Sequence, residues 1–175
     1  MTQSKYARIE YERRFLLAGV PDGEVLRTAD IDDRYLDGTR LRLRRQAERG
    51  GPVIFKLTQK LPRPGQYGEI TTLYISEDEH AALAGLPAAA LRKTRLSIAP
   101  YGVDVFAAPF EGLVLAEAEF ESARDAEQFS PAAFCHAEVT GDARFTGGTL
   151  VRAAREDVAA WAAEYGIEIG AAATT

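Results

Sequence analysis

Residues Arg8–Leu17 have the sequence RIEYERRFLL, in which charged and apolar side chains alternate. The even-numbered positions from 8 to 14 are all charged, and the odd-numbered positions are apolar or aromatic except at Arg13. Successive side chains of a strand point to opposite faces of a sheet. The alternation therefore predicts a β-strand with one charged face and one apolar face.

Similar alternation continues outward from this stretch over the first two-thirds of the chain. Turn and loop segments separate the alternating runs, at Pro21–Gly23, Asp37–Gly38, Glu48–Gly51 and Pro62–Gly65. The runs predict strands at Glu24–Leu36, Thr39–Gln46, Val53–Leu61, Tyr67–Ile75, Arg95–Pro100, Gly102–Phe106 and Leu113–Glu121, with a short extended segment at Ala137–Thr140.

Three helices are predicted between and after these strands. Ser76, with Glu79 three residues further on, forms a capping box that opens a helix over Glu77–Leu86. A second helix is predicted over Ser122–Phe129. A third is predicted over Thr149–Tyr165, where apolar residues recur at helical spacing.

These elements favour a closed barrel. Open sheet edges invite aggregation, so about eight antiparallel strands in one domain usually close. The helices need an apolar sheet surface to cover, which places the apolar faces outward and the charged faces inward. We predict a mainly β (α+β) single domain over residues 1–175. It is an eight-stranded antiparallel closed barrel with a charged interior, flanked by about three helices that include the C-terminal one. The alternative is an open sheet with one solvated charged face.

Length and composition exclude several classes of protein. With 175 residues and 46% apolar residues, the chain can bury a core and is not wholly disordered. Its N-terminal residues contain no apolar signal segment, and the longest uncharged stretch, Ala81–Leu91, is far shorter than the ~20 residues of a membrane span. The single Cys135 excludes an internal disulfide. The sequence therefore predicts a cytoplasmic protein without a membrane partner.

Two pairs of glutamates stand out on the charged faces. Glu10 and Glu12 are two residues apart on one predicted strand, and Glu117 and Glu119 repeat this spacing on another. Each pair directs its carboxylates to one side of its strand. If folding brings the pairs together, they offer four oxygen ligands for a hard cation such as Mg²⁺ or Mn²⁺. A solvated strand surface is the alternative.

The basic residues indicate an anionic ligand. Several arginines on one strand face repel one another unless an anion lies among them. The net charge of −5 and the lack of aromatic residues on these faces argue against nucleic acid, whereas a chain of phosphates suits arginine geometry. Phosphoryl transfer from a polyphosphate requires carboxylates that hold a metal on one wall of the site and basic residues that bind the phosphate chain on the opposite wall. The cationic set is Arg40, Arg42, Arg44, Lys56, Lys60, Lys93 and Arg95.

Short motifs in a fixed order strengthen this interpretation. They are IEYERRFLL (9–17), RYL (34–36), TRLRLR (39–44), FKLTQK (55–60), LRKTR (91–95), GVDVFAAPFEGLVLAEAEFES (102–122) and EVTGDARFTGGTL (138–150). In this order they resemble the opening Glu-x-Glu-x-Lys motif, the basic strands, the late acidic strands and the closing motif of the CYTH, or triphosphate tunnel metalloenzyme, family. The resemblance covers Ile9–Leu150, most of the chain.

The resemblance implies a fold and a set of activities. The family fold is an eight-stranded antiparallel tunnel with charged walls. Its members hydrolyse inorganic triphosphate or thiamine triphosphate, remove RNA 5′-phosphates or cyclise ATP, and all of them use a divalent metal. The implied cofactor is Mg²⁺ or Mn²⁺, and the implied partner is a small anionic triphosphate. Family members are often dimers, so the resemblance allows a homodimer, and the sequence does not determine the oligomeric state.

Carried over by position, the resemblance implies three groups of site residues. The metal group is Glu10, Glu12, Glu117 and Glu119, with Asp104 and Glu138 as helpers. The phosphate-binding group is Arg40, Arg42, Arg44, Lys56, Lys60 and Arg95. The catalytic group is Arg14, Tyr35 and Lys93, of which Tyr35 matches a tunnel tyrosine of the hydrolase branch.

Two positions depart from the family pattern. Arg14 stands where the opening motif has lysine, which keeps the charge, but a guanidinium cannot act as a base. Gly102 stands where many relatives carry an acidic or aromatic-flanked residue, so the loss of one wall contact is expected. Both departures keep open a non-catalytic module that binds polyphosphate or nucleotides.

Among the family activities, hydrolysis of a small substrate is favoured. Adenylate cyclases carry a His-Phe-based motif near the second strand, where this chain has DDRYLDGT (32–39). Thiamine triphosphate needs an aromatic platform, and the only tryptophan, Trp161, is expected in a helix core. RNA triphosphatases have larger basic surfaces. The sequence therefore predicts a hydrolase of inorganic tripolyphosphate, or of a nucleoside triphosphate, that acts by in-line attack of water on a terminal phosphorus.

Overall fold

The computed structural model describes residues 5–61 and 67–170, and the predicted turn at Pro62–Gly65 lies outside the described residues. The strands are β1 (Arg8–Leu17), β2 (Arg27–Leu36), β3 (Leu41–Glu48), β4 (Val53–Leu61), β5 (Gly68–Ile75), β6 (Ala88–Ile98), β7 (Tyr101–Phe106), β8 (Val114–Phe120) and β9 (Ala137–Glu138). The helices are α1 (Glu77–Ala84), α2 (Ala123–Gln128), the 3-10 turn η1 (Ala143–Phe145), α3 (Gly147–Leu150) and α4 (Arg155–Ala163). Within the described ranges, no helix has the length and apolar character needed to cross a membrane.

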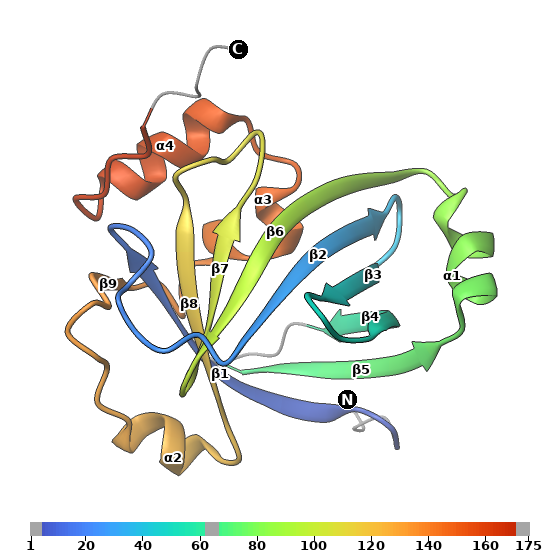
Figure 1. The fold of residues 1–175 in the computed structure, drawn as a ribbon, viewed down its shortest axis with the longest axis horizontal. Helices are drawn as coiled ribbons and strands as arrows, with labels where there is room; N and C mark the ends of the chain where they lie inside the picture. The colour runs from blue at the N-terminus through green and yellow to red at the C-terminus, as the bar shows by residue number, and fades with distance from the viewer. Residues whose placement is uncertain (1–4, 62–66, 171–175) are drawn as a thin grey trace.

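The strands form one antiparallel sheet that closes on itself (Figure 1). Its order is β5-β4-β3-β2-β6-β7-β8-β1, and β1 also pairs with β5 through Arg8–Glu10. The rest of β1, Tyr11–Leu17, pairs with β8, and β9 pairs with Phe15 and Leu16. The predicted mainly β fold with an eight-stranded closed barrel is confirmed, and β9 is an additional strand.

The largest differences from the predicted elements lie in β6, β2 and the C-terminal helix. β6 begins at Ala88 rather than at Arg95, because its first residues pair with β2, although their run of alanines shows no alternation. β2 begins at Arg27 rather than at Glu24, because its pairing with β6 begins at Arg27, which is opposite Ser97 near the end of β6. The predicted C-terminal helix is interrupted at Ala154, whose ψ of 154° is extended, so that α3 and α4 are separate helices.

Arg13 breaks the alternation of β1 because its charged side chain lies on the outer surface of the barrel. Its guanidinium makes a two-pronged ion pair with Glu138 on β9, at 2.8 Å and 2.6 Å. It also donates hydrogen bonds to the carbonyl oxygens of Ala126 and Phe129. Arg13 thus ties α2 and β9 to β1, and the inward face of β1 keeps the charged residues predicted from the sequence.

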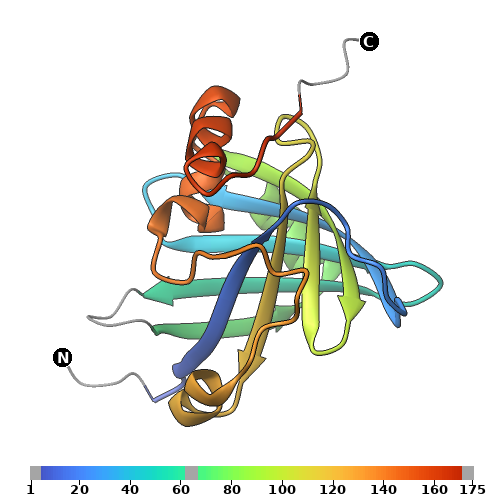
Figure 2. The ribbon, with the colours of Figure 1, turned by 90° about the vertical axis from the view of Figure 1, so that its left-hand side faces the viewer.

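Apolar residues form two core clusters between the barrel strands and the segments that pack on them. One cluster, which includes Phe15 and Val103, lies beneath the segment 121–136. The other joins Leu16 to Leu150 and Val158 of the C-terminal helices. Figure 2 agrees with Figure 1 in placing α3 and α4 together at one end of β7 and β8, with α2 toward the opposite end. The face of β1 that is charged from position 8 to 14 therefore becomes apolar where the C-terminal helices pack.

Gly147, at the start of α3, packs directly against Tyr35 of β2. A Cβ atom at position 147 would lie 2.1 Å from Tyr35 Oη, whereas the nearest atom to a Cβ at Gly148 is 3.8 Å away. We expect Gly147→Ala to lower the free energy of unfolding by about 1–3 kcal/mol, because Tyr35 must move within a packed core. Gly148→Ala is the matched control and should have little effect. Urea unfolding measures both, and equal effects would contradict the prediction.

Candidate functional site

The barrel encloses a cavity of about 1240 Å³ that is lined by inward-facing side chains. Most of the predicted site residues line it, although they come from strands far apart in the sequence. Asp104 and Glu138 do not line it. Those that do are Glu10, Glu12, Arg14, Tyr35, Arg40, Arg42, Arg44, Lys56, Lys60, Lys93, Arg95, Glu117 and Glu119.

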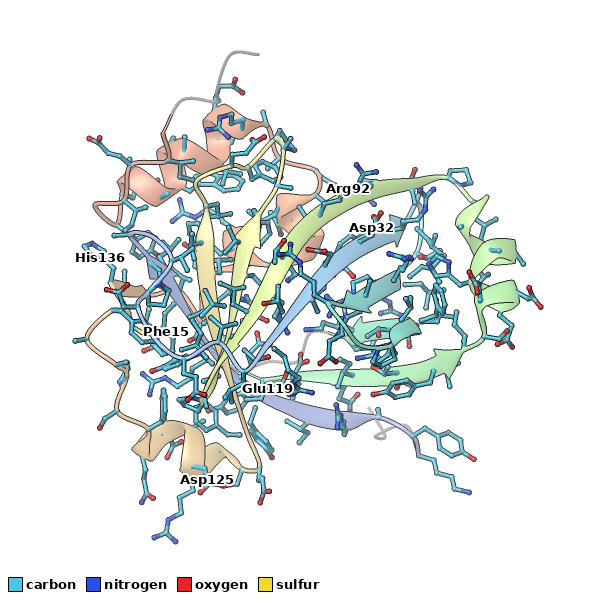
Figure 3. The ribbon with its side chains drawn as sticks, viewed as in Figure 1. Phe15, Asp32, Arg92, Glu119, Asp125 and His136 are labelled. Carbon is cyan, nitrogen blue, oxygen red and sulfur yellow. The ribbon has the colours of Figure 1, made fainter. Side chains whose placement is uncertain are left out.

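Three carboxylates from two neighbouring strands converge in this cavity. Glu10 and Glu12 lie on β1, and Glu119 (labelled in Figure 3) lies on β8 opposite Glu12 in the sheet register. Each offers one oxygen, and these oxygens all lie within 4.8 Å of one another. Hard oxygen donors at this spacing suit Mg²⁺ or Mn²⁺. The residues present therefore fit the expected metal, and we call Glu10, Glu12 and Glu119 the carboxylate cluster.

Two basic residues, Arg14 and Lys60, accompany the three glutamates of the carboxylate cluster. Burial and, after it, the negative charge of Glu117 raise the pKa of Glu12 to about 7 against the opposing charges of Arg14 and Lys60. Arg14 forms an ion pair with Glu12, and Lys60 Nζ lies 2.7 Å from Glu10 Oε2. A cation held among these carboxylates would relieve their repulsion.

Glu117 is not among the converging carboxylates, and two arginines bind its oxygens instead. Arg14 Nε donates to Glu117 Oε1 at 3.0 Å, and Arg95 Nη2 donates to Oε2 at 2.6 Å. Burial alone would raise the pKa of Glu117, but the charges of Arg14 and Arg95 hold it well below its usual value. Glu117 is therefore a charged anchor for two arginines in the cavity wall.

Asp104 on β7 anchors a second group of cations from below the cavity surface. Its side chain is 1% exposed, and it accepts two hydrogen bonds from Arg95, at 2.7 Å and 2.6 Å, and one from Lys93. Burial would raise the pKa of Asp104, but Arg95 and Lys93 keep it lowered. Burial lowers the pKa of Lys93 against the opposing charge of Asp104. Asp104 thus holds Lys93 and Arg95 rather than facing the carboxylate cluster.

Asp33 on β2 is a site residue that the sequence analysis missed. It accepts two hydrogen bonds of 2.6 Å from Arg44, and Arg42 Nε lies 3.6 Å from its Oδ1. Burial would raise its pKa, but the hydrogen bonds and charge of Arg44 lower it to about 2. The available signal was its spacing of two residues from Tyr35, which places both side chains on the inward face of β2.

The remaining cations of β3 and β4 face the cavity with few anionic partners. Arg42 Nε is buried and has no hydrogen-bond partner among the described residues. Burial lowers the pKa of Lys56, and the positive charges of Arg44, Arg42 and Arg95 lower it further. The Lys56 ammonium lies 5.2 Å from the ring centre of Tyr74, a cavity residue that the sequence analysis did not single out. We call Arg42, Arg44 and Lys56 the basic wall of β3 and β4. An anion bound in the cavity would stabilise these positive charges.

Three predicted site residues have distinct surroundings. Arg40 is exposed and lines the cavity in the connection between β2 and β3. Burial and the charge of Asp33 raise the pKa of Tyr35 to about 12, so its phenol stays protonated at neutral pH. Glu138 lies on β9 and is paired with Arg13 outside the cavity, so the structure does not bring it to the carboxylate cluster.

The fold and the cavity together define a class of protein: a closed antiparallel β-barrel that holds a carboxylate cluster beside a basic wall. The crystal structure of the inorganic triphosphatase NE1496 is similar to this chain, with 26% identity, coverage of 83% of this chain and 95% of that chain, and a TM-score of 0.56. A crystal structure of the hypothetical protein NE1496 also has 26% identity, with coverage of 82% and 98% and a TM-score of 0.55. No family model and no curated protein matches the sequence.

Proposed function

We propose that this chain is a triphosphate tunnel metalloenzyme of the CYTH family that hydrolyses inorganic tripolyphosphate with a divalent metal. The observation that carries the proposal is the presence, in one cavity, of the carboxylate cluster and the basic wall of β3 and β4. Similarity to a protein named an inorganic triphosphatase supports the same class of activity. A nucleoside triphosphate presents the same phosphate chain and is the second substrate to test.

The basic wall would bind the phosphate chain and stabilise the leaving group. In the proposed reaction, water attacks the terminal phosphorus in line with the bridging P–O bond. A new P–O bond forms as the bridging bond breaks, and the proton that the water loses is released to the bulk solvent, so that orthophosphate and pyrophosphate result. Arg42, Arg44 and Lys56 donate to the phosphate oxygens and stabilise the charge that develops on pyrophosphate.

The carboxylate cluster would hold Mg²⁺ or Mn²⁺, which when bound neutralises charge on the phosphate oxygens. Arg14 keeps Glu12 and Glu117 in place through its ion pairs. Because a guanidinium stays protonated, Arg14 acts by position and charge and does not accept the proton of the attacking water.

The tryptophan and the two histidines, which bear on thiamine triphosphate hydrolysis and ATP cyclisation, lie outside the cavity lining. Trp161 packs against the core cluster of the C-terminal helices and does not line the cavity. His80 packs on the ring of Phe55, and His136 hydrogen-bonds the carbonyl oxygen of Tyr165, so neither histidine lines the cavity. These placements favour hydrolysis over cyclisation, and they remove Trp161 as a platform for the rings of thiamine triphosphate.

Phosphate release by the purified protein tests the proposal. We expect release that requires Mg²⁺ or Mn²⁺, stops in EDTA and is faster with tripolyphosphate than with ATP or thiamine triphosphate. The arginine at position 14 specifically favours the alternative of a non-catalytic phosphate-binding module. No release from any substrate, together with a tripolyphosphate-dependent rise in Tm, would establish that alternative instead.

The cytoplasmic location, the homodimer and the lack of nucleic-acid and membrane partners stay predictions.

A further inference from the structure

The side chain of Arg95 crosses a whole strand to reach Glu117. Arg95 lies on β6 and Glu117 on β8, and β7 lies between these two strands. In the sheet register, Arg95 is opposite Asp104 and Glu117 is opposite Gly102, both on β7. The guanidinium binds Asp104 and also donates to Glu117 Oε2 at 2.6 Å. It must therefore pass over the inward surface of β7.

Gly102 is the residue that leaves room for this crossing. A Cβ atom at position 102 would lie 3.3 Å from both Cδ and Nε of Arg95 and 3.4 Å from its Cζ. Arg95 thus occupies the space in which a side chain of residue 102 would stand. The wall contact that the sequence analysis expected to be lost at Gly102 is replaced by a contact made by Arg95. Alanine would require a small shift of Arg95, whereas a larger side chain would displace it.

The crossing determines which carboxylates are available to a cation. Arg95 and Arg14 each bind one oxygen of Glu117 and hold that carboxylate apart from the cluster on β1 and β8. If Arg95 were displaced, Oε2 of Glu117 would face the cavity without its partner, and one positive charge would leave its vicinity. Both changes would favour the binding of a divalent cation.

We propose that Gly102 is a positioning residue that lets Arg95 hold Glu117 across β7 and thereby limits the cation site to Glu10, Glu12 and Glu119. This inference rests on the proposed function, because it assumes that the carboxylate cluster binds a divalent metal.

Calorimetric titration with Mn²⁺ in the absence of phosphate tests the inference without reference to activity. We expect Gly102→Val to bind Mn²⁺ with a Kd lower by about threefold or more, and Gly102→Ala to show a smaller change. Arg95→Met removes the crossing side chain and should tighten binding in the same direction. In the Arg95→Met background, Gly102→Val should have no further effect, because no guanidinium is left to displace.

Ser97→Val is the matched control. Ser97 is opposite Gly102 in the register and also lines the cavity, but it lies on β6 and so does not stand between β6 and β8. Its Kd for Mn²⁺ should equal that of the wild type. Thermal unfolding establishes which variants are folded. If Gly102→Val does not fold, the Kd values of Arg95→Met and Gly102→Ala are compared with that of the wild type instead.

The outcomes separate the inference from the function on which it rests. A wild-type protein that does not bind Mn²⁺ overturns both. A wild-type protein that binds Mn²⁺, with folded Gly102→Val and Arg95→Met variants whose Kd values are unchanged, overturns the inference alone. Equal tightening in Gly102→Val and Ser97→Val also overturns it, because added bulk anywhere in the cavity would then be the cause.

Discussion

Replacing Glu10 and Glu12 together with glutamine is expected to abolish metal-dependent release of phosphate from tripolyphosphate. The amides keep the size of the carboxyl groups and remove two of the negative charges that converge with Glu119. Because a bound divalent metal contributes several kcal/mol of transition-state stabilisation, we expect kcat/KM to fall by about 100-fold or more. Phosphate release at increasing Mn²⁺ concentration measures the effect.

The double variant should remain folded, because Arg14 keeps its 3.0 Å ion pair with Glu117. Circular dichroism checks the fold. Glu127→Gln is the charge control, since this exposed side chain belongs to α2, away from the cavity. A folded double variant that hydrolyses tripolyphosphate within about tenfold of the wild-type rate would contradict the metal assignment.

The second large effect is expected on stability, from Asp33→Asn. Asp33 is 1% exposed and holds Arg44, itself buried, through two hydrogen bonds of 2.6 Å. The substitution leaves the guanidinium of Arg44 buried without its main counter-charge. Since an uncompensated buried charge is strongly unfavourable, we expect the free energy of unfolding at neutral pH to fall by about 3 kcal/mol or more. Urea unfolding measures this loss.

The pH dependence of the Asp33 effect provides an independent check. The pKa of Asp33 is lowered from 3.8 to about 2 in the folded protein, so its ion pair contributes fully above pH 3.8 and is lost as the pH falls through 2. The difference in stability between wild type and Asp33→Asn should therefore shrink over this range. Asp30→Asn, which breaks an exposed pair with Arg49, is the matched control and should change stability little. A difference that is independent of pH would contradict the assigned pair.

Much of the barrel could be predicted from local patterns. The alternation in RIEYERRFLL correctly predicted β1 and its charged inward face, since the strand period of two is a property of the backbone. The one exception, Arg13, is explained by Glu138, which lies 125 residues away in the sequence. The start of β6 could not be predicted, because Ala88–Ala90 have no alternation and become a strand by pairing with β2.

The residue types of the cavity were thus determined by the sequence alone: carboxylates on β1 and β8, and arginines and lysines on β3, β4 and β6. Only the tertiary structure decided which of these charges pair with one another. Glu117 is held by Arg14 and Arg95, and Asp33 by Arg44, while Glu10, Glu12 and Glu119 converge. The physical reason is that ion pairing depends on distances of a few ångströms between side chains of different strands. Those distances are set by the register in which the barrel closes and by the space left at Gly102, which no local sequence pattern encodes.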